Sequence, residues 1–173
     1  MADERIEALV GELLRARGWT ICTAESCTGG LVMHRLTNIP GSSDYVVGGV
    51  VAYSNAVKQR LLHVRPGTLI AHGAVSEETA QEMAVGARQL LGADVSVSIT
   101  GIAGPGGGSP EKPVGLTYIG LAAPDGVLMV QRHIWKGDRE AIKNASANAA
   151  LLLAFDFLSK TDARIERHNR QGE

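Results

Sequence analysis

The stretch AESCTGG, residues 24–30, sets the organisation predicted for the whole chain. A short β-like run over residues 20–23 precedes it, and an apolar, helix-like run begins at Leu31. A strand that ends in a polar, glycine-bearing turn and opens a helix places Ser26 where free backbone N–H groups converge. That geometry suits an anionic ligand or the oxyanion formed during acyl transfer, and this stretch by itself leaves both open.

Length and composition are those of one compact domain. The chain has 173 residues, of which 45% are hydrophobic and 20% charged. A chain of this length can bury a core, and this composition is too apolar for global disorder. We predict a single domain over residues 1–159, followed by a polar, aperiodic tail over residues 160–173.

Composition also disfavours several classes of function. Lys+Arg 17 against Asp+Glu 18 leaves a net charge of -1, and aromatic residues make up 4%, so the chain offers neither a basic surface nor a stacking platform for nucleic acid. The N-terminus lacks the pattern of a signal peptide, and no apolar run reaches the ~20 residues of a membrane span. Cys22 and Cys27 are too few for a disulfide framework and lack the His cluster of a zinc site. We therefore expect a cytoplasmic protein with no metal, cofactor, nucleic-acid or membrane partner.

The spacing of apolar residues predicts alternating helices and strands. The helices are expected over residues 3–17, 26–37, 56–63, 76–91 and 139–158, and the strands over residues 19–24, 45–53, 94–100, 116–122 and 127–135. The strand at 45–53 is almost continuously apolar, which indicates burial on both faces. Residues 64–75 are expected to be irregular, and the glycine- and proline-rich residues 101–115 to form a long loop.

Strands interleaved with helices predict an α/β fold, here a three-layer α/β/α sandwich with a mixed, mostly parallel sheet of about five strands. The segment Pro124-Asp125-Gly126 is typical of a hairpin, which requires one antiparallel pair. Ser26, Tyr53 and Thr100 all fall at strand ends. If those ends share one edge of the sheet, a ligand site is expected there.

Ser26 has two interpretations of equal weight from the residues alone. It caps a helix, as serine commonly does, or it is a nucleophile that needs a base. The five histidines of the chain show no triad context. Lys58, five residues after Tyr53, is the alternative base, because burial after a strand would favour its neutral form. A lysine on a short helix is more often solvated, and the spacing alone favours that interpretation.

Other segments carry weaker signals. Residues 100–108 match neither a Walker A nor a Rossmann motif, and form either a flexible connection or a backbone wall close to a flat or phosphorylated ligand. Lys136 and Arg139 lie at a helix start, where cations oppose the helix dipole and a bound anion would explain them, although an exposed arginine there is common. Cys27 is a rival nucleophile without an activating neighbour. Glu25 orients a neighbour or closes the turn.

Four segments together resemble the CinA C-terminal domain family, the nicotinamide-nucleotide amidohydrolases: TAESCTGG at 23–30, YSNAVK at 53–58, SITGIAGPGGGSPEKPVG at 98–115 and KGDRE at 136–140. The resemblance extends from about residue 3 to residue 158, in a stand-alone form. It implies an α/β/α sandwich, usually assembled as a homodimer or larger homo-oligomer. It also implies hydrolysis of nicotinamide mononucleotide to nicotinate mononucleotide and ammonia.

The resemblance also assigns roles to residues. Ser26 takes the position of the nucleophile, Lys58 that of its base, and Tyr53 assists. Thr100 and Arg139 match positions that line the substrate site, and Gly101 adjoins them. We expect backbone N–H groups of the turn to hold the oxyanion; the residues concerned are Cys27, Thr28, Gly29 and Gly30. The alternative is a binding module that holds a nucleotide or phosphate at the same helix start without chemistry.

Overall fold

The computed structural model describes residues 5–170, with side chains for residues 5–160. Its α-helices are α1 (Ile6–Arg17), α2 (Leu31–Thr37), α3 (Asn55–Leu62), α4 (Pro66–His72), α5 (Glu77–Leu91) and α6 (Arg139–Arg170). Its strands are β1 (Ile21–Glu25), β2 (Val46–Val51), β3 (Val95–Gly101), β4 (Leu116–Ala122) and β5 (Leu128–Ile134). Short 3-10 turns, η1 (Ser42–Asp44) and η2 (Pro124–Gly126), precede β2 and β5.

The strands form a single mixed sheet with the order β2-β1-β3-β4-β5. β1 pairs in parallel with both β2 and β3, whereas β4 is antiparallel to its neighbours β3 and β5. Four strands therefore run in one direction and β4 alone runs in the other. The predicted mixed, mostly parallel sheet is confirmed, and the antiparallel pairs arise at the loop 102–115 and at the predicted hairpin.

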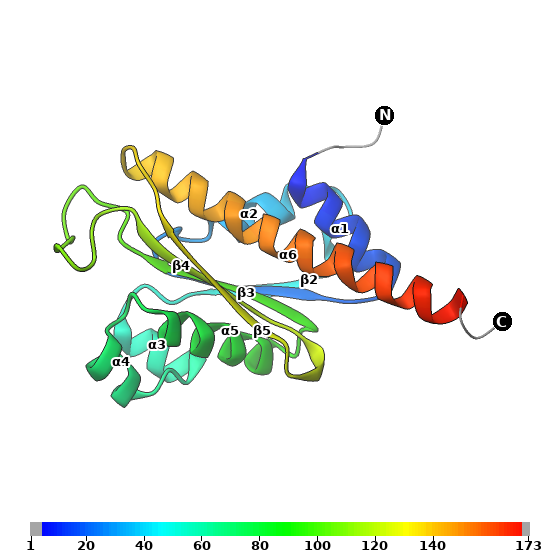
Figure 1. Cartoon of the computed structure of the whole chain (residues 1–173), viewed down its shortest axis with the longest axis horizontal. Helices are drawn as coiled ribbons and strands as arrows, with labels where there is room; N and C mark the ends of the chain where they lie inside the picture. The colour runs from blue at the N-terminus through cyan, green and yellow to red at the C-terminus, as the bar shows by residue number, and fades with distance from the viewer. Residues whose placement is uncertain (1–4, 171–173) are drawn as a thin grey trace.

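Helices cover both faces of the sheet, as the three-layer prediction requires (Figure 1). α1, α2 and α6 pack on one face, and α3, α4 and α5 lie on the other (Figure 1). The larger apolar core lies under the first group and includes Leu14, Ile21, Val97 and Leu151. A smaller core under the second group includes Cys22, Leu62 and Met83. None of the helices in the described chain is both long and apolar enough to cross a bilayer.

The register of the parallel strands brings the predicted site segments to one edge of the sheet. Glu25, the last residue of β1, pairs with Val51 of β2 on one side and with Ile99 of β3 on the other. The carboxyl ends of three adjacent strands therefore coincide, which is where open α/β sheets bind ligands. Ser26, Tyr53 and Thr100 follow or end these strands, so the expected shared edge is confirmed.

Two expectations about element boundaries are wrong for local reasons. α2 begins at Leu31 rather than at Ser26, because Gly29 and Gly30 have φ values of 66° and 99° that a right-handed helix does not adopt. At the other end of the chain, α6 continues to Arg170, past the expected end at Leu158. No proline or glycine interrupts residues 139–170, so nothing in that stretch ends the helix.

Two further expectations fail because they depend on the tertiary position of a segment. β2 is an edge strand, and its side chains alternate between partly buried and exposed, with Val47 45% and Val51 50% exposed. The apolar run is therefore not buried on both faces. Residues 64–75 are not irregular throughout, since Pro66 occupies the first turn of α4, a position that suits its fixed φ and missing N–H.

Candidate active site

Ser26 and Lys58 are in hydrogen-bond contact. The Lys58 Nζ lies 3.1 Å from the Ser26 Oγ across 32 residues of sequence. Lys58 is 1% exposed and Ser26 8% exposed. The solvated-lysine interpretation favoured by the spacing is wrong, and the interpretation as a buried partner of Ser26 is confirmed.

The path of the chain after β2 explains how a lysine comes to be buried here. The Ala52 N–H donates to the Glu25 carbonyl, which continues the strand pairing by one residue. Ser54 then caps α3 by accepting from the Val57 N–H. The first turns of α3 therefore lie beside the end of β1, and this position brings the side chain of Lys58 to Ser26.

The Nζ of Lys58 donates to uncharged acceptors in this position. Besides Ser26, its Nζ donates to the carbonyls of Ala52 at 2.7 Å and Tyr53 at 3.4 Å. The ion pairs between described residues do not include Lys58. Burial disfavours the ammonium form and lowers the pKa of Lys58 below its usual value, against a smaller opposing effect of Cys27. A lysine that loses its proton more readily beside a serine hydroxyl has the properties of a general base.

Glu25 fixes the turn that carries Ser26. Its carboxylate is 0% exposed and accepts four hydrogen bonds, from the Thr28 hydroxyl and from the N–H groups of Gly30, Val32 and Met33. Those three N–H groups belong to the start of α2, so the carboxylate caps the helix from the preceding strand. The sequence interpretation of Glu25 as a turn-closing group is confirmed.

This cap changes the roles expected for the turn residues. Gly30 already donates to Glu25, and Gly29 donates to the Ser26 carbonyl, so neither N–H is free for an oxyanion. The Thr28 hydroxyl is likewise committed to Glu25. Within the described residues, the N–H groups of Cys27 and Thr28 donate to no backbone carbonyl, and the Cys27 N–H interacts only with its own side chain, where it lowers the pKa of the thiol. They are the donors of this turn that remain available beside Ser26.

Tyr53 and Arg139 contact each other rather than Ser26. Tyr53 is 63% exposed, and its hydroxyl accepts from Arg139 at 3.2 Å. Only its backbone carbonyl approaches Lys58. A second nitrogen of Arg139 donates to the Gly104 carbonyl at 2.6 Å. In this conformation Tyr53 is therefore not placed to relay the proton of Ser26, and Arg139 links it to the glycine-rich loop.

Thr100 and Gly101 shape the wall of the site. The Thr100 hydroxyl donates to the Ala74 carbonyl at 2.6 Å, which holds the segment before α5 against β3. A Cβ on Gly101 would lie 2.7 Å from the Thr117 Oγ1, so close packing of β3 on β4 already requires glycine there. The glycine-rich loop is further anchored by Lys112, whose Nζ donates to the carbonyls of His72 and Val75. It is not a free flexible connection.

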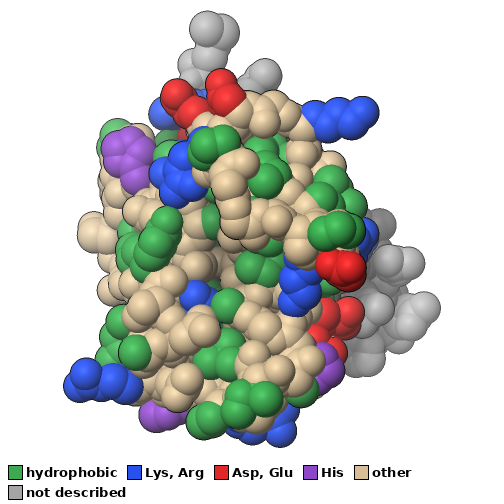
Figure 2. All heavy atoms as spheres, turned by 90° about the vertical axis from the view of Figure 1, so that its left-hand side faces the viewer, with side chains coloured by type: hydrophobic (Ala, Val, Ile, Leu, Met, Phe, Trp, Pro, Cys, Tyr) green, Lys and Arg blue, Asp and Glu red, His purple; other side chains and the backbone are tan. Residues whose placement is uncertain are grey.

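These groups surround a cavity of about 290 Å³ at the carboxyl ends of the strands, close to the size of small-molecule sites. It is lined by Ser26, Cys27, Tyr53, Asn55, Lys58, Ala74, Val75, Thr100, Gly101, Ile102, Ala103, Gly104, Gly106, Gly107 and Arg139. Figure 2 views the molecule from the side on which the loop 102–115 lies in Figure 1, and apolar, polar and charged side chains are mixed over that face. The cavity therefore brings together Ser26, Lys58, Tyr53, Thr100 and Arg139 from four separate segments.

Burial disfavours Cys27 as a competing nucleophile. Its side chain is 6% exposed, and burial raises the pKa of its thiol to about 11. Burial raises the pKa of the Cys22 thiol to about 12. Because the thiolate is the reactive form, both cysteines are almost entirely unreactive thiols at neutral pH.

Some site residues were missed by the sequence reasoning. Asn55 lines the cavity directly after the Ser54 cap, and the YSNAVK segment that contains it was the available signal. Ala74 and Val75 also line it, but no local pattern distinguishes them. Lys143 was not considered from the sequence, and its Nζ is 3.9 Å from where a Cβ on Gly29 would lie.

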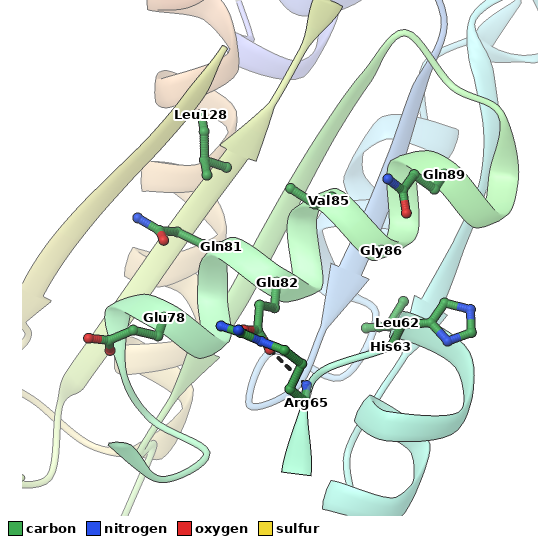
Figure 3. A pocket seen from close by; sticks show the side chains of 10 residues that line it. All are labelled: Leu62, His63, Arg65, Glu78, Gln81, Glu82, Val85, Gly86, Gln89 and Leu128. Carbon is green, nitrogen blue, oxygen red and sulfur yellow. Dashed lines mark hydrogen bonds and ion pairs between the residues drawn. The ribbon is translucent and has the colours of Figure 1, made fainter. Parts of the chain in front are cut away.

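A second cavity, of about 340 Å³, lies along α5 (Figure 3), and Ser26 is not part of its lining. Its lining includes Leu62, Val85 and Leu128. The charged pair in its wall is already satisfied, because Arg65 and Glu82 are 2.6 Å apart. None of the residues predicted for the site lines it, so the Ser26 cavity is the candidate active site.

Comparison with known proteins identifies the family of this fold and site. The family model of the CinA C-terminal domain matches residues 3–158, and the chain belongs to that family. A CinA-like protein of Chlorobaculum tepidum is 53% identical over 154 residues, which are 87% of this chain and 36% of that protein. The chain thus spans little more than a third of the length of such curated relatives.

Solved structures agree with the family and the fold. The competence/damage inducible protein CihA from Agrobacterium tumefaciens is 41% identical, with a TM-score of 0.83 over 90% of this chain and 98% of that chain. A CinA superfamily protein from Klebsiella pneumoniae is 36% identical, with a TM-score of 0.86 over 90% of this chain and 96% of that chain.

Proposed function

We propose that this protein hydrolyses the carboxamide of nicotinamide mononucleotide to nicotinate mononucleotide and ammonia. The observation that carries the proposal is the 3.1 Å contact between the Ser26 hydroxyl and the buried amine of Lys58. A serine needs a base to become a nucleophile, and a buried lysine beside it is the arrangement of a Ser–Lys hydrolase. The substrate is taken from the family resemblance.

In the first half of the reaction, the Ser26 Oγ attacks the carboxamide carbon while its proton passes to the neutral Nζ of Lys58. The N–H groups of Cys27 and Thr28, which donate to no backbone carbonyl, would hold the developing oxyanion. Loss of one such donor costs about 3–4 kcal/mol in comparable sites. The C–N bond then breaks, Lys58 returns the proton to the leaving nitrogen, and ammonia departs.

In the second half, a water molecule resolves the nicotinoyl ester on Ser26. Lys58, neutral again after ammonia has left, accepts a proton from that water as it attacks the ester carbon. Collapse of the intermediate returns a proton to the Ser26 oxygen and releases the carboxylate product. The Arg139–Tyr53 pair lies at the rim of the cavity, where we assign it to contacts with the ribose phosphate rather than to proton transfer.

The alternative is a binding module that holds an anion at the start of α2 without chemistry. The Glu25 cap counts against it, because a buried carboxylate already accepts from the first N–H groups of that helix. A second anion at the same donors would meet both an occupied site and a negative charge. The free N–H groups lie instead beside Ser26, where an oxyanion would form.

The decisive experiment measures ammonia released from nicotinamide mononucleotide by wild type, Ser26→Ala and Lys58→Arg. Lys58→Arg keeps the positive charge and hydrogen-bond donors but removes the ability to accept a proton at neutral pH. We expect Ser26→Ala to lose roughly a thousandfold or more of kcat, and Lys58→Arg to lose about 10²–10⁴-fold. Turnover that persists in Ser26→Ala would disprove the nucleophile. Stoichiometric nucleotide binding without ammonia would favour the binding module.

A further inference from the structure

A cation that the proposed mechanism does not use lies beside the turn of Ser26. Lys143, on α6, is partly buried, and its Nζ is 3.9 Å from the position of a Cβ on Gly29. Lys143 and Lys58 both act electrostatically on Cys27, so the amines of two lysines lie near the turn. Among the described residues Lys143 makes neither a hydrogen bond nor an ion pair.

Lys143 lines a cavity that adjoins the candidate active site. This cavity measures about 420 Å³ and is lined by Leu31, Arg139, Glu140, Lys143 and Asn144. Arg139 also lines the cavity that contains Ser26, so both cavities border its side chain. A ligand whose amide lies at Ser26 would pass Arg139 to reach Lys143.

Among the described residues, neither cation of the Lys143 cavity forms an ion pair. Arg139 and Lys143 are four residues apart and share one face of α6, and the side chain of Lys143 leans back toward the helix start. Both cations lie near the positive end of the helix dipole, which disfavours them. Glu140 lines the same cavity but is exposed and forms no described ion pair with either residue. An anionic ligand would offset this arrangement.

Arg139 is already partly committed. Two of its nitrogens donate to the Gly104 carbonyl and to the Tyr53 hydroxyl, so its first role is to hold the loop and the rim. The N–H donors of the Lys143 amine are not used by any described residue, so they are available to a ligand. The neighbouring Gly29 is exposed, has a φ of 66° and carries no side chain, so it leaves the space in front of the amine open to a bulky group.

We propose that Lys143, together with Arg139, holds the phosphate of the substrate over Gly29 and makes the site selective for a nucleoside monophosphate over the phosphate-free nucleoside. This assignment rests on the proposed function and deepens it by naming the residue that selects the substrate class. The amide lies at Ser26 and Lys58, the sugar passes Arg139, and the phosphate lies at Lys143.

The test compares nicotinamide mononucleotide with nicotinamide riboside in wild type, Lys143→Met, Lys143→Arg and Lys160→Met. Lys160 is an exposed lysine of the same helix that lines neither cavity. Lys160→Met therefore removes the same charge as Lys143→Met, but at a position outside the site. We expect Lys143→Met to lower the ratio of kcat/KM for the mononucleotide to that for the riboside about tenfold or more, mainly through KM. Lys143→Arg should restore most of the ratio, and Lys160→Met should keep it.

A binding measurement separates this inference from the amidase proposal. Ribose 5-phosphate, which has no amide, is titrated into the same proteins by calorimetry. If wild type releases no ammonia but binds ribose 5-phosphate about tenfold or more tightly than Lys143→Met, the amidase proposal fails and the phosphate assignment holds. If ammonia is released but Lys143→Met changes neither the substrate ratio nor this affinity relative to Lys160→Met, the phosphate assignment is wrong.

Discussion

Lys58 contributes to the pH dependence of the protein's stability and activity. Its pKa is lowered in the folded protein by burial, whereas the unfolded chain has an ordinary lysine pKa of about 10.4. Between these two values the unfolded state binds more protons than the native state, so stability rises with pH across that window and levels off above it. Below the folded pKa both states are protonated and this contribution is constant.

The corresponding prediction uses Lys58→Met as the reference, because subtraction removes the other titrating groups. The free energy of unfolding of wild type minus that of the variant should increase as pH rises toward 10, as measured by urea denaturation. The value of kcat/KM should rise over the pH range in which folded Lys58 loses its proton. A difference between the two proteins that is flat or falls with pH would contradict the lowered pKa.

Cys27 provides a second prediction at the level of single residues. Its thiol has a pKa of about 11 because of burial, so the native protein should react with iodoacetamide at pH 8 far more slowly than the same protein unfolded in urea. Cys27→Ala should retain amidase activity within about tenfold, since the proposed mechanism uses only the backbone N–H of residue 27. Abolished turnover in a folded Cys27→Ala protein would make the thiol part of the chemistry.

The residue-level prediction from sequence was correct where the local pattern carried the information. The strand–turn–helix at 24–30 was anticipated from its residues, whereas the pairing of Ser26 with Lys58 was expected only from the family resemblance, because the spacing alone favoured a solvated lysine. The direction of Tyr53 was not, because the contact of its hydroxyl with Arg139 joins segments 86 residues apart. The burial of Lys58 depends on which side of α3 meets the sheet, and a helix this short does not show that in its sequence.

At the level of elements, the contact between α3 and α5 holds Lys58 in place. A Cβ on Gly86 of α5 would overlap the Leu62 carbonyl and lie 2.6 Å from the Leu62 carbonyl carbon. Leu62 ends α3, the helix that carries Lys58. We expect Gly86→Ala to destabilise the fold by about 1–3 kcal/mol through overpacking, despite the better helix propensity of alanine, and to reduce turnover by displacing Lys58.

Gly67 is the matched control for this substitution. It lies in α4, and a Cβ there would meet nothing within 4 Å. Gly67→Ala should be neutral, or stabilising by up to about 1 kcal/mol, because alanine restricts the unfolded chain more than glycine does. The two variants are compared by thermal denaturation and by ammonia release. Equal stability of Gly86→Ala and Gly67→Ala would show that α3 moves to accommodate the added methyl group on α5 without cost.

The elements that sequence reasoning misjudged are those whose character depends on their neighbours. β2 has the composition of a fully buried strand but occupies the edge of the sheet. Its pairing with β1 is also irregular and close, since the register shifts between Ile21 and Cys22 of β1 and a Cβ on Gly49 would overlap Thr23. Whether a strand is covered on one face or on both depends on its place in the strand order. The sequence of a single segment does not contain that information.

At the scale of the whole molecule, both edges of the sheet expose apolar side chains. Val47 and Val51 lie on β2, and Leu128, Met129 and Ile134 on β5, each at least 36% exposed. The family resemblance implies a homodimer or larger assembly, and these edges offer surface for it. We therefore expect light scattering to give at least twice the 18.2 kDa of one chain. A monomer across the micromolar range would contradict this expectation.

The first and last helices of the fold lie against each other, which has a consequence for how the protein is made. α1 packs on α6 (Figure 1), Trp19 stacks on Phe157 at 6.4 Å, and Arg139 at the start of α6 completes the rim of the site. During synthesis the strands β1 to β5 leave the ribosome before the helix that covers much of one face. The nascent chain therefore carries an open apolar sheet until its last helix is translated, and amidase activity would report that final step.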